Sequence, residues 1–465
     1  MNEDLRTREL CLDILLAVSR GEEHSHVLIK GVLDKYDDWD GSRKAFLKKL
    51  TMGVLERKVE LDYVISRFSS TPVSKLKPVI RTILEIGIYQ ILYMDSVYDT
   101  KAVNLSVELA KKRGPKQLSG FVNGVLRNVS RQKDGIVFPE KSENPVLYLS
   151  VKYSVPEWIV KEIVGQYGEE RAETMFADSL NEAPIRVHMR STLSDGKKQE
   201  LLEAWKEAGI EVIPCSFLPD AYTLKNAESI SGVKGFSEGY FHVQDFSSQL
   251  SGYLAPLQAG DLVVDVCAAP GGKSIYVADK LEKLESGRSE KNGENERGRV
   301  FAYDISGSKV GKILENAERM RIFNISCEVR DASVANPAMK NKADLLIADV
   351  PCSGLGVIGR KPDLKYRLKE QDFKEIVELQ KKIVTEAVKD VKNGGYFLYS
   401  TCTVNQGENI DMVRWMCENL PLEEASFDNL PEELKDSLVS KGCVQLISGE
   451  HDCDGFFISL LRRIQ

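Results

Sequence analysis

Two cysteines stand at the ends of runs that predict buried strands. Cys402 closes "GGYFLYSTC", and fifty residues earlier Cys352 follows "ADLLIADVP". In a parallel α/β sheet the carboxyl ends of the strands line the ligand site, so both thiols stand where such a sheet presents its working residues. A cysteine there is a candidate nucleophile, because its thiolate is accessible near neutral pH. The alternative is a pair of inert cysteines buried at strand ends.

Two thiols beside one pyrimidine would suit methylation of cytosine at C5. A thiolate that adds at C6 converts the ring to an enamine-like species, which accepts a methyl group at C5; a base then removes the C5 proton and the thiol leaves. Asp349 could assist the addition by sharing a proton at N3, and the base must be flipped or single-stranded to be reached. Chemistry alone does not decide which thiol attacks C6. In DNA cytosine methyltransferases the attacking thiol is the cysteine that follows a proline, and in this sequence that cysteine is Cys352.

The stretch "VVDVCAAPGGKS", residues 263–274, predicts a strand, a glycine turn and the start of a helix. Three ligands compete for such a loop. A phosphate loop requires GxxxxGK[ST], but Cys267 stands in place of its first glycine, and the dinucleotide fingerprint GxGxxG is absent. An S-adenosylmethionine site needs an acid at the end of the next strand for the ribose hydroxyls, and "FAYDIS" supplies Asp304.

The next two predicted strands also end in acidic residues. Asp331, at the end of "CEVRD", is placed for the adenine amino group, and Asp349 ends the fourth strand. Asp304 lies 39 residues beyond Asp265, more than the ~20 of a compact unit, and the polar insertion at 285–299 accounts for the excess. Each acid alone is also a common helix cap, but together with the glycine loop they favour a sulfonium ligand over a nucleoside triphosphate.

Strands and helices alternate from about residue 260, which predicts a parallel, doubly wound α/β sheet. Residues 145–240 mix helices with short extended pieces and predict a small α+β module. The expected strands of the large sheet are 261–270, 298–306, 325–333, 342–351, 394–402 and 454–463.

Residues 1–135 predict an all-helical bundle. Apolar residues recur at helical spacing through 42–68, with Ser42 as the expected N-cap, and residues 80–94 are apolar nearly all round, which indicates a central buried helix. Residues 1–135 hold 23 Lys+Arg and 18 Asp+Glu, although the whole chain has a formal net charge of -7. The cluster Lys111, Lys112, Arg113 and Lys116 is therefore a candidate RNA-phosphate contact; an ordinary solvated helix end is the alternative.

The composition is typical of a globular protein of two or three domains, with 465 residues, 42% hydrophobic and 29% charged. No apolar run approaches the ~18 residues of a membrane span, and the charged N-terminus lacks the apolar core of a signal peptide. The nine cysteines form no CxxC pair, and the five histidines show no ligand spacing. We expect a cytoplasmic protein with no membrane partner and no metal, and a monomer as the simplest state.

These motifs resemble those of one family. "DVCAAPGGKS", "DVPCSGLG" and "STCT", in this order, resemble the RNA 5-methylcytosine methyltransferases, as do "VQDFSSQL" and "DGFFISLLRR". Residues 1–135 resemble the NusB-type RNA-binding domain, notably in "LEIGIYQILYM" and "GFVNGVLRN". The combination resembles the bacterial RsmB (Sun, Fmu) type, which methylates C5 of one cytosine in 16S ribosomal RNA.

The resemblance implies a NusB-like helical RNA-binding domain at 1–135, an α+β module at 145–240, and a Rossmann-like class I methyltransferase domain at 241–465. It implies S-adenosylmethionine as cofactor and 16S ribosomal RNA as partner, with Cys402 as the nucleophile and Cys352 assisting product release. The implied cofactor contacts are Cys267, Ala268, Ala269, Pro270, Gly271, Gly272, Lys273, Asp304, Asp331 and Asp349.

The sequence leaves two other functions open. A non-catalytic NusB-like RNA-binding or antitermination factor would explain the first third, but it leaves the thiol pair, the glycine loop and the strand-end acids unexplained. A P-loop ATPase is weakened by Cys267. Binding of S-adenosylmethionine without binding of ATP would distinguish the enzyme from both.

Overall fold

The computed structural model describes residues 3–227, 229–286 and 297–464. Within these ranges the chain divides into two compact units: Met1–Asn181 with Ile358–Glu370, and Glu182–Val357 with Gln371–Gln465. Most of the insertion expected at 285–299 lies outside the described residues.

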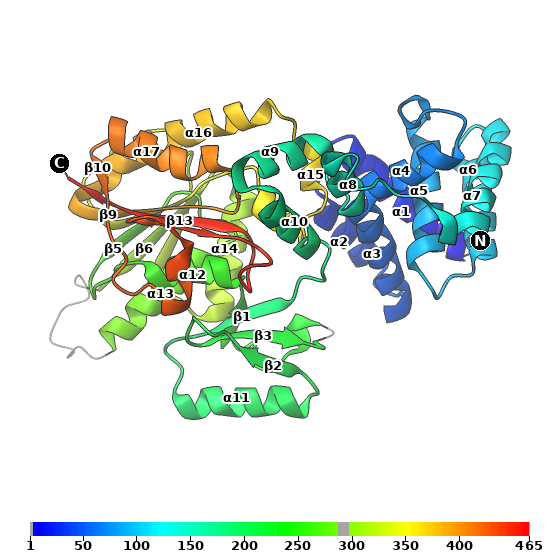
Figure 1. Ribbon diagram of the computed structural model, residues 1–465. Coiled ribbons are helices and arrows are strands. Elements are labelled where there is room, and N and C mark those ends of the chain that lie inside the picture. Colours follow the sequence, from blue (N-terminus) through cyan, green and yellow to red (C-terminus); the bar gives the residue numbers. More distant parts are fainter. Residues whose placement is uncertain (1–2, 228, 287–296, 465) are drawn as a thin grey trace. The chain divides into compact units, whose positions relative to one another are not determined.

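The first unit is helical (Figure 1). Its central helix is α5, Pro78–Tyr93, which is buried nearly all round, as the apolar sequence predicts, and which packs against α1, α3, α4, α6 and α7. The helices before and after it are α1 (Glu3–Ser19), α2 (Ser25–Lys35), α3 (Gly41–Glu56), α4 (Lys58–Phe68), α6 (Asp99–Arg113), α7 (Ser119–Gln132), α8 (Pro145–Lys152), α9 (Glu157–Tyr167) and α10 (Glu169–Asp178).

The helical character expected through 42–68 is confirmed, but the N-cap expected at Ser42 is wrong. The structure has two helices there, α3 and α4, and α3 is capped by Asp40, whose carboxylate accepts from Arg43 N at 2.8 Å, rather than by Ser42. The first turn of α4 is capped from far along the chain, because Ser154 Oγ accepts from Val59 N at 2.9 Å. Helical periodicity within 42–68 cannot reveal a capping group that lies outside it.

A short segment from the second half of the sequence belongs to the first unit. Residues 358–370 contain α15, Leu364–Arg367. Asp363 accepts a hydrogen bond from Ser25 Oγ at 2.7 Å, and Lys365 Nζ donates to the carbonyl oxygen of Glu56 at 3.0 Å. These long-range bonds fix the segment on the helical unit although the residues on either side of it belong to the second unit.

The second unit begins with a small antiparallel sheet in the order β2-β3-β1-β4, covered by α11 (Asp195–Glu207). Leu201 and Trp205 of α11 are fully buried against it. The predicted α+β character of this region is confirmed. The strands are β1 (Ile185–Met189), β2 (Glu211–Pro214), β3 (Ala221–Lys225) and β4 (Phe241–Val243).

The large sheet has the strand order β11-β12-β13-β9-β8-β5-β6-β7, and β10 pairs with β13. All six predicted strands form, and five of them run parallel, as expected. The sixth, β13, is antiparallel to β9, and the short strands β10 to β12 were not predicted. The bounds are β5 (Leu262–Asp265), β6 (Arg299–Asp304), β7 (Ile325–Val329), β8 (Ala343–Asp349), β9 (Val391–Thr401), β10 (Leu422–Glu424), β11 (Leu438–Ser440), β12 (Cys443–Leu446) and β13 (Phe456–Arg463).

Helices cover both faces of this sheet (Figure 1). On one face lie α12 (Phe246–Leu254), α13 (Gly272–Glu285) and α14 (Gly307–Met320); on the other lie α16 (Asp372–Ala387) and α17 (Ile410–Asn419). Each layer encloses its own apolar core. The strands are therefore buried on both faces, and the carboxyl ends of the parallel strands are left as the place for a ligand.

Within the described ranges the structure shows neither a membrane-spanning helix nor a metal-binding cluster. No helix in them is both long and apolar enough to cross a membrane. No three His, Cys, Asp or Glu side chains within the same ranges are grouped so that they could hold a metal ion.

Candidate functional site

The loop after β5 is held by two acids at the strand ends. Asp265 is buried and accepts from Ser274 Oγ at 2.6 Å and from Cys267 N at 3.3 Å. Asp304, at the end of β6, accepts from Ala269 N at 3.0 Å. Burial raises the pKa of Asp265 to about 7. The loop that sequence patterns assign to the cofactor is thus tied to both strands beneath it.

Gly271 makes the sharp entry into α13. Its φ of +105° lies in the region that favours glycine. A Cβ built on it would also come within 3.0 Å of Ile313 Cγ2 on α14. Both the backbone conformation and the close approach of α14 therefore explain why glycine stands at this position.

Lys273 and Asp349 form an ion pair at the centre of the strand ends. Lys273 Nζ lies 2.7 Å from Asp349 Oδ2 and donates to Ser248 Oγ at 2.9 Å. The other carboxylate oxygen, Asp349 Oδ1, accepts from Ser400 Oγ at 2.8 Å, because the parallel register of β8 and β9 places Asp349 opposite Ser400. The lysine that would contact a phosphate in a P-loop is here committed to a carboxylate.

The two thiols come together at the ends of β8 and β9. Cys352 Sγ lies 3.3 Å from Cys402 Sγ. The neighbouring Cys402 thiol and burial raise the pKa of Cys352 well above its usual value, and the carboxylates of Glu408 and Asp349 add to the effect. Two thiols this close cannot both ionise readily, so the pair holds at least one proton near neutral pH.

A buried polar network fixes the loop that carries Cys352. Glu408 is fully buried, and its Oε2 accepts from Ser353 N at 2.9 Å and from Gln380 Nε2 at 3.1 Å. Gln380 Nε2 also donates to Pro351 O at 2.9 Å, and Ser353 Oγ is hydrogen-bonded to Thr403 Oγ1 at 2.7 Å. Ser353 is therefore anchored to the segment that follows Cys402, and Pro351 is anchored to Gln380 of α16.

Asp331 is placed differently from the other acids. Its Oδ1 accepts from the backbone N and the Oγ of Ser333, at 2.9 and 2.7 Å, in an exposed turn after β7. Those hydrogen bonds lower the pKa of its carboxyl. The preceding residue, Arg330, donates its N to Asp304 O at 2.8 Å, which ties this turn to the end of β6. The adenine contact expected of Asp331 stays a prediction.

The strand ends fit the chemistry of S-adenosylmethionine. The carboxylates of Asp304 and Asp349 suit a ligand that carries hydroxyl donors and a sulfonium charge. Ile305, directly after Asp304, leaves 63% of its surface exposed and offers an apolar face for a planar ring. Burial, with Asp265, Asp349 and Asp304 nearby, raises the pKa of Cys267, and such acidic surroundings disfavour a triphosphate.

Sequence reasoning missed the residues that support this site. Ser248 and Ser400 hold the Lys273–Asp349 pair, and Glu408 with Gln380 holds the loop of Cys352. Glu408 lies in the same "STCTVNQGENID" stretch as Cys402. Its closeness to Cys402 in the sequence could therefore have identified it as a candidate supporting residue. Gln380 lies within α16 and carries no comparable signal.

The basic cluster of the first unit is partly engaged within that unit. Lys112 Nζ pairs with Glu9 Oε2 at 2.8 Å, and Arg113 pairs with Asp13 as well as with Glu9. Lys111 and Lys116 are exposed. The cluster is therefore less free for RNA than its charge suggests.

Comparisons with known families cover most of the chain. The family described as 16S rRNA methyltransferase RsmB/F matches residues 252–462, and the NusB family matches residues 5–131. The ferredoxin-like domain of RsmF/B-like methyltransferases matches residues 155–231.

Curated relatives align along nearly the full length. The probable ribosomal RNA small subunit methyltransferase B of Bacillus subtilis is 33% identical over 460 residues, which cover 98% of each chain. The protein of the same name in Synechocystis is 29% identical over 470 residues, 99% of this chain and 100% of that one. The ribosomal RNA small subunit methyltransferase B of Salmonella enteritidis is 29% identical over 453 residues, 96% of each chain.

Solved structures show the same fold. The crystal structure of PH0851 has a TM-score of 0.78 at 22% identity and covers 97% of this chain and 98% of its own. NSun6 from Pyrococcus horikoshii, solved with SFG, has a TM-score of 0.55 at 18% identity and covers 67% of this chain and 98% of its own.

Proposed function

The chain belongs to the 16S rRNA methyltransferase RsmB/F family, and on that premise we propose that it methylates C5 of a cytosine in 16S ribosomal RNA, with S-adenosylmethionine as methyl donor and a covalent bond from Cys402 to C6. One observation carries the cytosine-C5 proposal: the two thiols lie 3.3 Å apart beside Asp349. Methylation at an oxygen or an exocyclic nitrogen needs no thiol, whereas C5 chemistry needs a nucleophile at C6.

The protein's part in the first half of the reaction is to activate C6. The Cys402 thiolate adds to C6 while Asp349, held at both oxygens by Lys273 and Ser400, hydrogen-bonds N3 and shares a proton there as charge develops. Addition turns C5 into a nucleophilic carbon. The bound cofactor supplies an electrophilic methyl group on its sulfonium, and Lys273, Asp304 and the loop 267–273 would hold that cofactor.

In the second half the covalent bond must break. A base takes the C5 proton, the electron pair restores the C5–C6 double bond, and Cys402 leaves as a thiolate. Cys352 keeps its proton, because burial and the neighbouring thiol raise its pKa, so it can donate a hydrogen bond to the departing sulfur at the observed spacing. This supports the proposed roles, in which Cys402 attacks and Cys352 assists product release.

Transfer of labelled methyl groups from S-adenosylmethionine to 16S ribosomal RNA, followed by bisulfite sequencing, tests this proposal. We expect one protected cytosine, and none after Cys402→Ala. Labelling at a position that bisulfite does not protect would contradict the cytosine-C5 assignment. Calorimetry with S-adenosylmethionine and with ATP, in which only the first should bind, tests the cofactor separately.

A further inference from the structure

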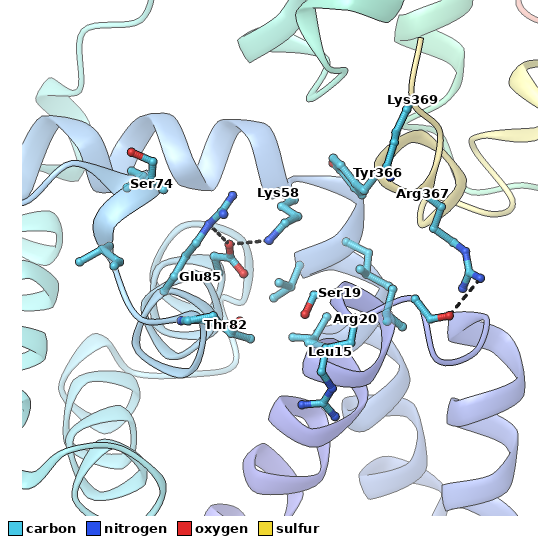
Figure 2. A pocket seen from close by; sticks show the side chains of 18 residues that line it. Leu15, Ser19, Arg20, Lys58, Ser74, Thr82, Glu85, Tyr366, Arg367 and Lys369 are labelled. Atoms are coloured by element: carbon cyan, nitrogen blue, oxygen red, sulfur yellow. Dashed lines mark hydrogen bonds and ion pairs between the residues drawn. The ribbon is translucent and has the colours of Figure 1, made fainter. Parts of the chain in front are cut away.

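The helical unit contains a cavity of about 680 Å³ that the proposed reaction does not use. It lies between the end of α1, the α3–α4 junction, the start of α5 and residues 366–369 of the segment inserted from the second half of the sequence. Figure 2 shows these side chains, with Lys58 and Glu85 on one side and Tyr366, Arg367 and Lys369 on another. Its volume is within the range of pockets that hold small ligands.

Most of the charged groups that line this cavity are cations. They are Arg20, Lys58, Arg81, Arg367 and Lys369; within the described part of the chain, the one acid that lines the cavity is Glu85. Glu85 pairs with both Lys58 and Arg81, at 2.7 and 3.1 Å, and Arg81 also pairs with Asp62. Arg20 pairs with Glu22. These ion pairs balance the cations of α4 and α5, which leaves Arg367 as the cation to consider for a ligand.

Arg367 has donors that its own chain does not satisfy. Its Nη2 reaches the carbonyl oxygen of Gly21 only at 3.5 Å. Its Nη1 is buried and has no hydrogen-bond partner among the residues that the structure describes. A guanidinium keeps its charge in any protein environment, and a buried donor without an acceptor costs free energy. An anion in the cavity would offer the guanidinium a stronger acceptor than the Gly21 carbonyl oxygen at 3.5 Å.

Apolar side chains form another part of the lining. Leu15 and Val18 of α1, Val54 and Leu55 of α3, and Leu76 contribute to it, and the ring of Tyr366 lies beside Arg367. A ligand that fits both parts carries a compact anion next to an apolar or planar body. A nucleotide has this composition: its phosphate suits a guanidinium, and its base suits an apolar wall with an aromatic ring.

We propose that this cavity binds a nucleotide, with the phosphate on Arg367 and the base against the apolar wall. The nucleotide could belong to single-stranded RNA or be free in solution, and binding measurements distinguish the two sources. If it belongs to RNA, the inference rests on the proposed function and adds a second contact with the substrate. The chain places this contact on residues 358–370, which begin six residues after Cys352.

Binding to the full chain, without S-adenosylmethionine, tests the site. The probes are a short fluorescent single-stranded RNA and, separately, uridine 5′-monophosphate with uridine as the phosphate-free comparison. We expect Arg367→Ala to weaken binding of the phosphate-bearing probe about tenfold, as for loss of a charge-assisted hydrogen bond. For RNA the salt slope should fall by about 0.7. Uridine should bind weakly, and Arg367→Ala should not change its binding.

Two further variants keep the test decisive. Ser74→Trp places a large ring at the exposed rim of the cavity without removing a charge and should weaken binding as Arg367→Ala does. Arg127→Ala removes one exposed charge from α7, outside the lining, and should leave nucleotide binding unchanged. Equal losses from Arg127→Ala and Arg367→Ala would mean a general charge effect and overturn the site. Full binding by a folded Arg367→Ala or Ser74→Trp variant would overturn it too.

The source of the nucleotide follows from the same data. If Arg367→Ala weakens RNA binding, the RNA supplies the nucleotide. If it weakens only uridine 5′-monophosphate binding, the site holds a free nucleotide and the link to the RNA substrate is excluded. None of these measurements involves methyl transfer, so failure of the cavity and failure of the proposed reaction are distinguishable.

Discussion

Cys352 Sγ and Cys402 Sγ lie 3.3 Å apart, although fifty residues separate them in the sequence. The parallel pairing of β8 with β9, with Asp349 opposite Ser400, brings the two strand ends side by side. In a hydrogen-bonded pair of thiols one sulfur donates and the other accepts. The geometry therefore suits unequal roles, one thiol that attacks and one that keeps its proton.

Substitution of Cys402 and substitution of Cys352 should block the reaction at different steps. We expect Cys402→Ala to abolish methyl transfer and to form no covalent complex with RNA. Cys352→Ala should still attack and transfer the methyl group, but it should release product slowly, because the departing Cys402 thiolate loses its hydrogen-bond donor. Denaturing gel electrophoresis after incubation with RNA and S-adenosylmethionine should then show an adduct for Cys352→Ala only.

Cys443, which is buried on β12 and hydrogen-bonded to Ser459, provides a matched control outside the site. Cys443→Ser should retain methyl transfer and accumulate no adduct. An adduct with Cys402→Ala and none with Cys352→Ala would reverse the assigned roles. Loss of activity in both variants without any adduct would exclude the covalent mechanism.

Asp304 should contribute to cofactor affinity. Asp304→Ala removes a carboxylate from the end of β6 together with its bond from Ala269 N. Loss of a charge-assisted hydrogen bond costs about 1.5–3 kcal/mol, which corresponds to roughly ten- to 150-fold weaker S-adenosylmethionine binding in calorimetry. Thermal unfolding of the variant controls for damage to the loop. A folded variant with unchanged affinity would remove Asp304 from the cofactor site.

Local patterns were sufficient to predict the main strands of the large sheet and to propose candidate residues at their ends. Hydrophobic runs marked all six predicted strands, and acids or thiols at their ends marked Asp304, Asp349, Cys352 and Cys402. These signals are local because each residue directly follows its own strand. Gly271 was identifiable for the same reason, as a glycine in the turn between a strand and a helix.

Contacts between distant segments could not be predicted in this way. The antiparallel direction of β13, the Ser154 cap on α4, and the docking of residues 358–370 on the helical unit all depend on tertiary packing. The pairing of Lys112 with Glu9 across 103 residues is a further case. Net charge counted along the sequence does not show which cations are already paired.

The four residues of the basic cluster should have two different roles, with Lys111 and Lys116 in RNA binding and Lys112 and Arg113 in stability. Lys111 and Lys116 are exposed, so replacing both by Ala should weaken RNA binding and lower the salt slope by about 0.7 per lost contact. Replacing Lys112 and Arg113 removes their ion pairs with α1. That change should lower the melting temperature more and RNA affinity less. Salt titrations and thermal unfolding measure the two effects, and an unaltered salt slope in the first variant would support a solvated helix end.

Lys365 should make stability depend on pH. Burial lowers the pKa of Lys365 from its usual value of 10.5 to about 7. Between these two pH values the unfolded chain binds a proton that the folded chain does not, so stability rises with pH. Below pH 7 the folded protein must carry a buried charge. Lys365→Met should therefore stabilise the protein at pH 6, by about 1–4 kcal/mol, and the gain should shrink as pH approaches 10. Denaturant unfolding at both values checks this; a gain that does not vary with pH would contradict the buried amine.

Glu408 should act through the position of Cys352 rather than through substrate. Its carboxylate accepts from Ser353 N and from Gln380 Nε2, so Glu408→Ala leaves buried donors unsatisfied and frees the loop that carries Cys352. Each such donor costs about 1–3 kcal/mol. We expect a lower melting temperature and a kcat reduced about tenfold or more, with KM for RNA nearly unchanged, because misplacement affects the chemical step.

Two comparisons separate this positioning role from a general loss of stability. Glu408→Gln keeps an acceptor oxygen and should recover part of kcat, whereas Glu418→Ala, on the exposed side of α17, should change neither kcat nor stability by more than about 0.5 kcal/mol. Since Cys352 is assigned to product release, Glu408→Ala should also accumulate some of the adduct seen with Cys352→Ala. A folded Glu408→Ala variant with full kcat and no adduct would show that the network around Glu408 does not position Cys352 for the reaction.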